Sequence, residues 1–114
     1  MFYIISLLSV FIVLDHANAK RVNPNPELRV QQYISDAKKG HAGAQFLVGE
    51  IYYNGYSIQK NKQEAYAWYK VAAIQKEPKA REALEKIRNE MTVAEVEAAE
   101  ILAKKYSEQF IIQP

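Results

Sequence analysis

Apolar residues recur at intervals of three and four along most of the chain after residue 25, which is the spacing of one face of an α-helix. Together with the polar residues that separate them, these stripes predict five helices, at residues 26–39, 41–54, 61–77, 78–91 and 92–110. No segment alternates convincingly between apolar and polar residues as a half-buried strand does. The pattern therefore predicts an all-α fold of about five antiparallel helices.

Several helix ends carry recognisable signals. Asn25 can accept hydrogen bonds from the free N–H groups of the first helix. Asn61 and Glu64, three residues apart, predict a reciprocal cap at the start of the third helix. Thr92 and Glu95 form the same motif at the start of the fifth. These caps support the boundaries drawn from the periodicity.

The clearest apolar face belongs to the third helix. Its members are Ala65, Trp68, Tyr69, Ala72 and Ala73. Leu47 and Ile51 of the second helix are expected to lie in the same core. Gly49 is expected to let Trp68 or Tyr69 approach the backbone, since Gly inside a helix costs about 1 kcal/mol relative to Ala. Gly55 is expected to take a left-handed conformation where the second helix ends.

The chain also repeats itself with a period of 36 residues. A shift of this length superimposes identical residues at positions 33 and 69, 37 and 73, 44 and 80, and 51 and 87. A period in the mid-thirties is typical of an antiparallel helix pair repeated as a solenoid. The expected architecture is therefore a short α-hairpin solenoid.

A set of small and aromatic residues stands at the spacings of a known repeat. It comprises Ala44, Leu47, Gly49, Tyr52, Gly55, Ala65, Trp68, Tyr69, Ala72, Ala73 and Ala80. Residues 37–80 resemble one full Sel-1-like repeat, a tetratricopeptide-like α-helical hairpin, with the repeat itself at about 40–76. Residues 26–39 then resemble the second helix of a preceding repeat, and residues 78–110 a terminal pair that closes the stack. The resemblance implies a protein–protein interaction scaffold and not an enzyme.

Three positions depart from the usual pattern of this repeat. Ser57 and Lys76 stand where Gly is usual, and Asn61 stands where Asp is usual. Asn61 keeps an oxygen that can cap a helix. Ser57 changes the loop after the second helix, and Lys76 weakens the case for a second complete repeat.

The first 19 residues have the organisation of an export signal. Residues 2–14 form an apolar run shorter than the roughly 20 residues that cross a bilayer, although no Lys or Arg precedes it. Ala17 and Ala19 supply the small-x-small pattern before a cleavage site. We expect a signal peptide at 1–19 that is cleaved after Ala19, a linker at 20–25 and a repeat domain at 26–110. The mature protein is expected to be periplasmic or secreted, bacterial, and without a stable membrane span.

Composition argues against several kinds of chemistry. The chain has no Cys, and His41 is the only His after the expected cleavage site, which excludes thiol, Cys-zinc and Ser-His-acid sites. His41 is expected to cap a helix, and neither a cofactor nor a metal is expected. A formal net charge of +2 with both signs interspersed argues against nucleic-acid binding. Acids and bases alternate through residues 79–100, which is typical of a solvated, salt-bridged face.

Aromatic residues outside the core stripes are the candidates for recognition. Tyr53 and Tyr56 lie where the second helix ends, and Glu50 lies one turn earlier. Tyr66 flanks the apolar face of the third helix. Exposed aromatic rings around a charge are typical anchors for a protein partner. For Tyr53 and Tyr56 a place in the core is an equal alternative, and Phe46 is expected to be buried against the first helix.

These features favour a non-catalytic protein-interaction module of the bacterial cell envelope. The resemblance implies the same, because exported proteins with this repeat are often linked to envelope functions or host contact. An alternative is a small periplasmic hydrolase acting on cell-wall or β-lactam substrates, an activity associated with a cysteine-rich subclass of the repeat family. The absence of Cys argues against that alternative. A third hypothesis is that the chain completes an oligomer or a larger assembly.

Overall fold

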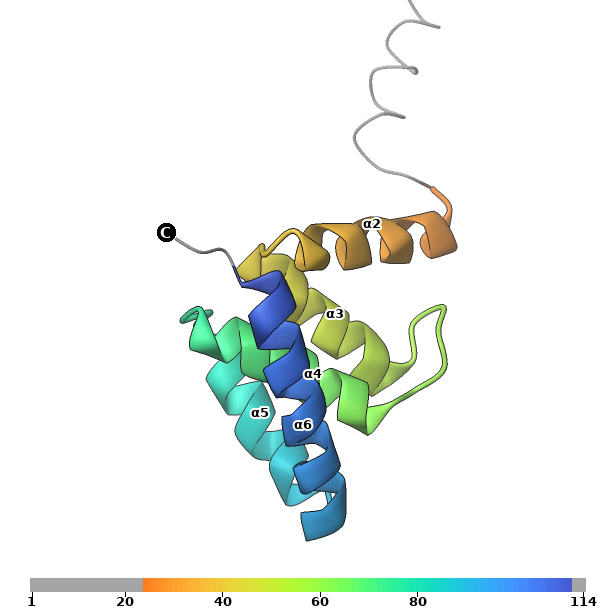
Figure 1. The fold of residues 1–114 in the computed structure, drawn as a ribbon. Coiled ribbons are helices and arrows are strands. Elements are labelled where there is room, and N and C mark those ends of the chain that lie inside the picture. Colours follow the sequence, from red (N-terminus) through yellow and green to blue (C-terminus); the bar gives the residue numbers. More distant parts are fainter. Residues whose placement is uncertain (1–23, 112–114) are drawn as a thin grey trace, which may run out of the picture.

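Five helices and no strand make up residues 24–111, the part of the chain that the computed structural model describes (Figure 1). They are α2 (Pro26–Lys38), α3 (Ala42–Asn54), α4 (Lys62–Ile74), α5 (Ala80–Asn89) and α6 (Val93–Phe110). The all-α prediction is confirmed, and every helix begins and ends within three residues of its predicted bounds. The expected signal peptide at 1–19 and most of the expected linker lie outside the described residues.

Three of the helices begin at side-chain caps. The Asn25 side chain accepts a hydrogen bond from the backbone N–H of Glu27 at 2.9 Å, and Asn61 accepts one from that of Glu64 at 3.0 Å. The cap at Asn61 is not reciprocal, because its own N–H donates to the carbonyl of Tyr52. His41 stands at the N-cap position of α3, but its side chain makes no capping hydrogen bond, so the expected capping role is wrong.

Helix α4 lies at the centre of the fold. It packs against α3, α5 and α6, and five consecutive residues of it, 65–69, are buried. Small and large side chains alternate along this stretch, so neighbouring helices approach at the alanines and pack around the rings. Full burial of one large apolar side chain stabilises a fold by about 1.5–3 kcal/mol. The packing of α4 therefore supplies much of the hydrophobic stabilisation.

Trp68 joins elements that are far apart in the sequence. It is buried in a cluster with Ala37 of α2 and Val48 of α3. Its ring centroid also lies 4.7 Å from that of Tyr106 and 5.6 Å from that of Phe110, both in α6. The expectation that Trp68 is core is confirmed. The contact of Trp68 with α6 was not predicted, because the apolar periodicity of α6 does not indicate which helix α6 packs against.

The close approach expected at Gly49 is made by Tyr69. A Cβ atom at Gly49 would lie 2.5 Å from Cδ1 of the Tyr69 ring, which no real contact allows. The ring of Phe46 packs on the same tyrosine, with centroids 5.8 Å apart. The expectation that Phe46 is buried against the first helix is therefore wrong, because α3 turns this side chain toward α4.

Leu47 does not lie in the core. It is 41% exposed, although the apolar stripe and the repeat pattern both predict a buried residue. The buried face of α3 consists of Gln45, Val48, Gly49 and Ile51. Leu47 is not part of this buried face.

Gln45 is fully buried in α3, although it does not belong to the apolar stripe that the sequence predicts for this helix. The side-chain amide of Gln45 donates to the carbonyl oxygens of Ala37, at 3.1 Å, and Phe110, at 2.8 Å. Its own carbonyl accepts from the Gln75 side chain at 2.7 Å, and Gln75 also donates to the Gly40 carbonyl at 3.1 Å. These bonds satisfy the buried amide of Gln45 and tie together the ends of α2, α4 and α6.

The 36-residue period reappears in the backbone. Gly40 follows the C-cap of α2 with φ 97°, and Lys76 follows the C-cap of α4 with φ 65°. Their N–H groups make equivalent hydrogen bonds, to the carbonyls of Ala37 and Ala73. Lys76 therefore keeps the left-handed conformation for which Gly is usual. Gly55 is left-handed as expected, and Ser57, the other departure from Gly, has φ 55°.

Adding a methyl group at each of the two glycines of α3 should change the stability of the fold in opposite directions. Gly49→Ala is expected to lower the free energy of unfolding by about 1–3 kcal/mol, because the new Cβ overlaps the Tyr69 ring. Gly43→Ala is the matched control: nothing lies within 4 Å of its Cβ position, so the change should raise stability by up to about 1 kcal/mol. Urea unfolding measures both changes. Equal effects of the two would contradict the packing of Tyr69 on α3.

Replacing Lys76, which has a left-handed backbone conformation, by glycine is expected to raise stability. Lys76→Gly should raise stability by up to about 1 kcal/mol, because strain of roughly 1–2 kcal/mol is relieved and the extra freedom of the unfolded chain offsets part of the gain. Lys79→Gly removes the same charge from an exposed position with ordinary negative φ and should not stabilise. Thermal melts of both variants provide the comparison. If Lys76→Gly lowered stability as much as Lys79→Gly, the backbone at Lys76 would not be strained.

Candidate functional site

The four residues predicted to bind a partner do not form one surface. Tyr66 is 0% exposed and belongs to the core, so its prediction as a recognition residue is wrong. The reason is that α4 is covered by helices on several sides, which buries residues beside its apolar stripe as well as those in it. Tyr53 lies between α3 and the end of α5, Glu50 of α3 is hydrogen-bonded to Tyr69 of α4, and Tyr56 lies in the loop after α3.

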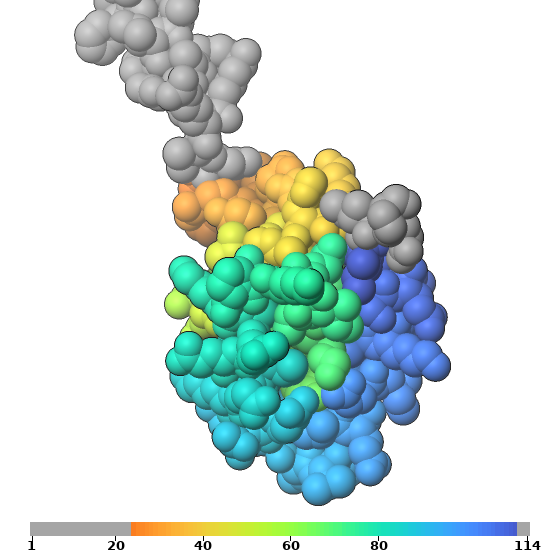
Figure 2. Space-filling view, turned by 90° about the vertical axis from the view of Figure 1, so that its left-hand side faces the viewer, coloured from red at the N-terminus to blue at the C-terminus, as the bar shows by residue number. Residues whose placement is uncertain are grey.

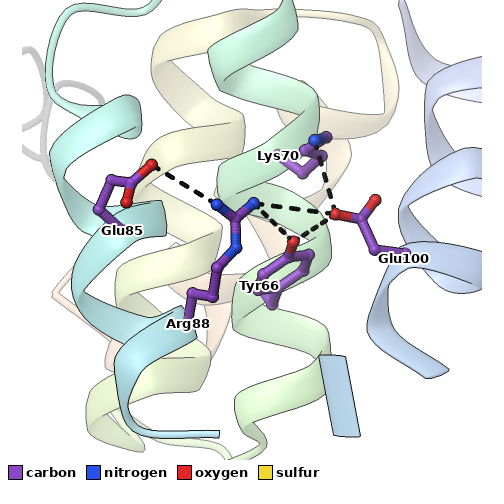
Figure 3. Close-up of polar contacts among 5 residues, drawn as sticks. All are labelled: Tyr66, Lys70, Glu85, Arg88 and Glu100. Atoms are coloured by element: carbon purple, nitrogen blue, oxygen red, sulfur yellow. Dashed lines mark hydrogen bonds and ion pairs between the residues drawn. The ribbon is translucent and has the colours of Figure 1, made fainter. Parts of the chain in front are cut away.

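The Tyr66 hydroxyl lies in a polar cluster that joins three helices (Figure 3). It donates a hydrogen bond to Glu100 of α6 and accepts one from Nη2 of Arg88 of α5 at 3.1 Å. Lys70 lies 3.5 Å from the same Glu100 carboxylate, and Glu85 lies 3.5 Å from Arg88. Both cations of this cluster face a carboxylate. The arrangement fixes α5 and α6 against α4 and leaves neither cation free to bind an anion.

Tyr53 and Glu50 also make contacts within the fold. The Tyr53 hydroxyl donates to both carboxylate oxygens of Glu90, at 2.8 and 3.0 Å, and Lys86 lies 5.4 Å from the centre of its ring. Glu50 accepts a hydrogen bond from the Tyr69 hydroxyl. Tyr53 thus links α3 to the end of α5. Of the two alternatives for this residue, the structure favours a packing role.

Tyr56 is the exposed member of the predicted set. It is 60% exposed and lines a groove of about 300 Å³ between α2 and the end of α3. Tyr33, 39% exposed, and Val30 line the groove from α2, together with Arg29, and Ile51 lines it from α3. Tyr33 is not among the recognition residues predicted from the sequence. Tyr33 aligns with the identical residue Tyr69 in the 36-residue repeat, but only Tyr69 is covered by another helix.

A second hollow, of about 210 Å³, lies between α4 and α6. Its lining includes the paired charges of Lys70 and Glu100 beside Ile74. It is smaller than the groove at α2, and two of its charged groups, Lys70 and Glu100, are already paired with each other. The groove at α2 is the better candidate for a recognition site.

Hydrogen bonds and burial keep the packed tyrosines protonated. Burial is the main cause that raises the pKa of Tyr66, Tyr69 and Tyr106 above the ordinary 10.0, and carboxylates beside the hydroxyls raise it further. For Tyr106 that carboxylate is Glu64, 3.0 Å away. The hydrogen bond to Glu90 is the main cause that raises the pKa of Tyr53. These hydroxyls act as donors that hold helices together.

Among residues 24–111, no group of three or more His, Asp or Glu side chains is arranged to hold a metal ion. Within the same residues, no helix is long and apolar enough to cross a membrane.

The raised pKa values predict loss of stability in alkali. Below pH 10 the tyrosines are protonated in both states, and the stabilisation is complete. Above it the unfolded chain releases protons that the folded chain keeps, so the free energy of unfolding falls as pH rises. Melting temperatures between about pH 9 and 12 should decrease steeply, and Tyr106→Phe should show a shallower decrease. A melting temperature that stays constant over this range would contradict the assignment.

Comparison with solved structures identifies the fold. The chain matches the crystal structure of c5321, described as a protective antigen present in uropathogenic Escherichia coli strains and displaying an SLR (Sel-1-like repeat) fold, with a TM-score of 0.74 at 24% sequence identity. The match covers 82% of this chain and 20% of that protein. No family model and no curated protein matches the sequence. The chain therefore has the Sel-1-like repeat fold that its sequence motifs predict.

Proposed function

We propose that the protein is a non-catalytic interaction module of the bacterial cell envelope, which binds a protein partner through the surface of its helical repeats. The observation that carries the proposal is the groove between α2 and α3, where Tyr33 and Tyr56 stand exposed beside the apolar Val30 and Ile51. Tyrosine rings set in an apolar depression are typical anchors of protein interfaces.

The position of the groove also supports a binding role. Helices form two of its walls, and the loop that carries Tyr56 is fixed at both ends. The N–H of Asn61 donates to the Tyr52 carbonyl at 3.0 Å, and the N–H of Tyr56 donates to the Ile51 carbonyl at 3.1 Å. A loop held in this way loses little conformational entropy on binding, which favours affinity.

The location in the envelope rests on the sequence. The apolar run at 2–14 and the cleavage pattern at Ala17 and Ala19 support export, with a mature protein beginning at Lys20.

The carboxylates support a non-catalytic role. A glycan hydrolase needs two carboxyl groups on either side of one cleft. Here four glutamates instead accept hydrogen bonds from tyrosine hydroxyls, and these are Glu50, Glu64, Glu90 and Glu100. Each is engaged in holding two helices together. No feature of the described residues favours the hydrolase alternative.

Site-specific cross-linking in cells tests the proposal. A photoreactive phenylalanine at position 56 should form a covalent adduct with one envelope protein. The same group at position 101, which is also exposed and apolar but lies on α6, should not. Equal adducts from the two positions, or none from position 56, would contradict binding at the groove. Turnover of a cell-wall fragment or a β-lactam by the purified protein, abolished by one Glu→Gln change, would contradict the non-catalytic role.

A further inference from the structure

The groove lies at one edge of the helices that residues 24–111 form. Figures 1 and 2 place α2 at one end of the described residues and the turn between α5 and α6 at the other. Helix α2 packs on α3 and, less extensively, on α6. Among residues 24–111, no helix covers the side of α2 that carries Tyr33, so this side differs from the corresponding side of α4.

The two sides can be compared because the 36-residue period is a geometric repeat. The N–H of His41 donates to the carbonyl of Asp36, and that of Glu77 donates to the carbonyl of Ala72. These two bonds are related by the same shift as those of Gly40 and Lys76 described above. The backbone at the end of α2 and at the end of α4 therefore follows one pattern, and residues 36 positions apart occupy equivalent places.

The apolar residues of the groove correspond to buried residues of the core. The equivalent pairs are Val30 and Tyr66, Tyr33 and Tyr69, and Ile51 and Ile87. In the core, the later member of each pair belongs to a single cluster, against which Phe46, Tyr52 and Tyr53 of α3 pack, together with residues of the later helices. The groove therefore presents the surface on which an α3-like helix packs, without such a helix among the described residues.

The polar groups of the groove indicate which charge its occupant should carry. In the core, the Tyr69 hydroxyl donates to Glu50, the residue directly after the glycine that contacts the tyrosine ring. The equivalent hydroxyl of Tyr33 has no hydrogen-bond partner within residues 24–111. Arg29 adds a positive charge to the lining. A carboxylate on the occupant would meet both groups.

We propose that the groove takes an amphipathic helix of a partner protein, which packs on α2 as α3 packs on α4. The helix presents a small residue to the Tyr33 ring, an acidic residue at the next position and aromatic residues three positions to either side. This inference rests on the proposed function and names the kind of segment that is bound. A second copy of the chain is the less suitable occupant, because its own α3 is already packed against α2 and α4.

A helix-stabilised peptide with the sequence of α3, residues 42–54, is the probe. A hydrocarbon staple can join positions 43 and 47, which are both exposed in α3. Fluorescence anisotropy of the labelled peptide with the purified protein should show saturable binding. Gly49→Leu in the peptide, or Tyr33→Ala in the protein, should weaken binding by about tenfold or more, because each removes the contact of a small residue with the ring.

Leu28→Ala is the matched protein control, since Leu28 is exposed on α2 and does not line the groove. It should leave peptide affinity unchanged, and melting curves should show that both protein variants stay folded. Absence of saturable binding, or equal binding by the Tyr33 variant, would overturn the inference. A concentration-dependent dimer in sedimentation that Tyr33→Ala abolishes would overturn it in favour of a second copy. If the peptide fails but cross-linking at position 56 persists, the proposed function stands without this inference.

Discussion

Burial of α4 is the constraint on which the rest of the described structure depends. Residues 65–69 are all buried, so no side of this stretch is left to water, and α3, α5 and α6 are each needed to cover it. The contacts that cover it are specific: Gly49 of α3 contacts the Tyr69 ring, and Tyr106 and Phe110 of α6 pack against Trp68. Tyrosine hydroxyls bonded to glutamates then fix the orientation of the helices around this core.

The same constraint explains where the candidate recognition surface lies. The position that Tyr69 occupies in α4 is occupied in α2 by Tyr33, and the helix that covers Tyr69 has no counterpart over Tyr33 among residues 24–111. An exposed aromatic groove is therefore a consequence of the repeat ending at α2 in the described structure. The proposed binding requires no change in the core, because the lining residues stand on α2, on α3 and on the loop that follows α3.

Periodicity and capping residues predicted the helices because these signals are local. Close contacts of glycine were also predictable, since a glycine inside a helix has a cost that packing must offset. The burial of Tyr66, the exposure of Leu47 and the exposure of Tyr33 were not predictable. Each depends on which other helix covers a given side, and an apolar stripe does not contain that information. Gln45 was missed for a related reason: its partners, the carbonyls of Ala37 and Phe110, come together only in the folded chain.

Hydrogen exchange of the free protein, followed by mass spectrometry, tests the central claim most directly. Amides exchange at rates set by the free energy of the opening that exposes them, so the element on which the fold depends should exchange last. Fragments covering α4 (Lys62–Ile74) are expected to exchange only on global unfolding, and fragments from the first half of α2 are expected to exchange much earlier. Equal protection of α2 and α4, or earlier exchange in α4, would contradict the central place of α4 and the less covered position of α2 among residues 24–111.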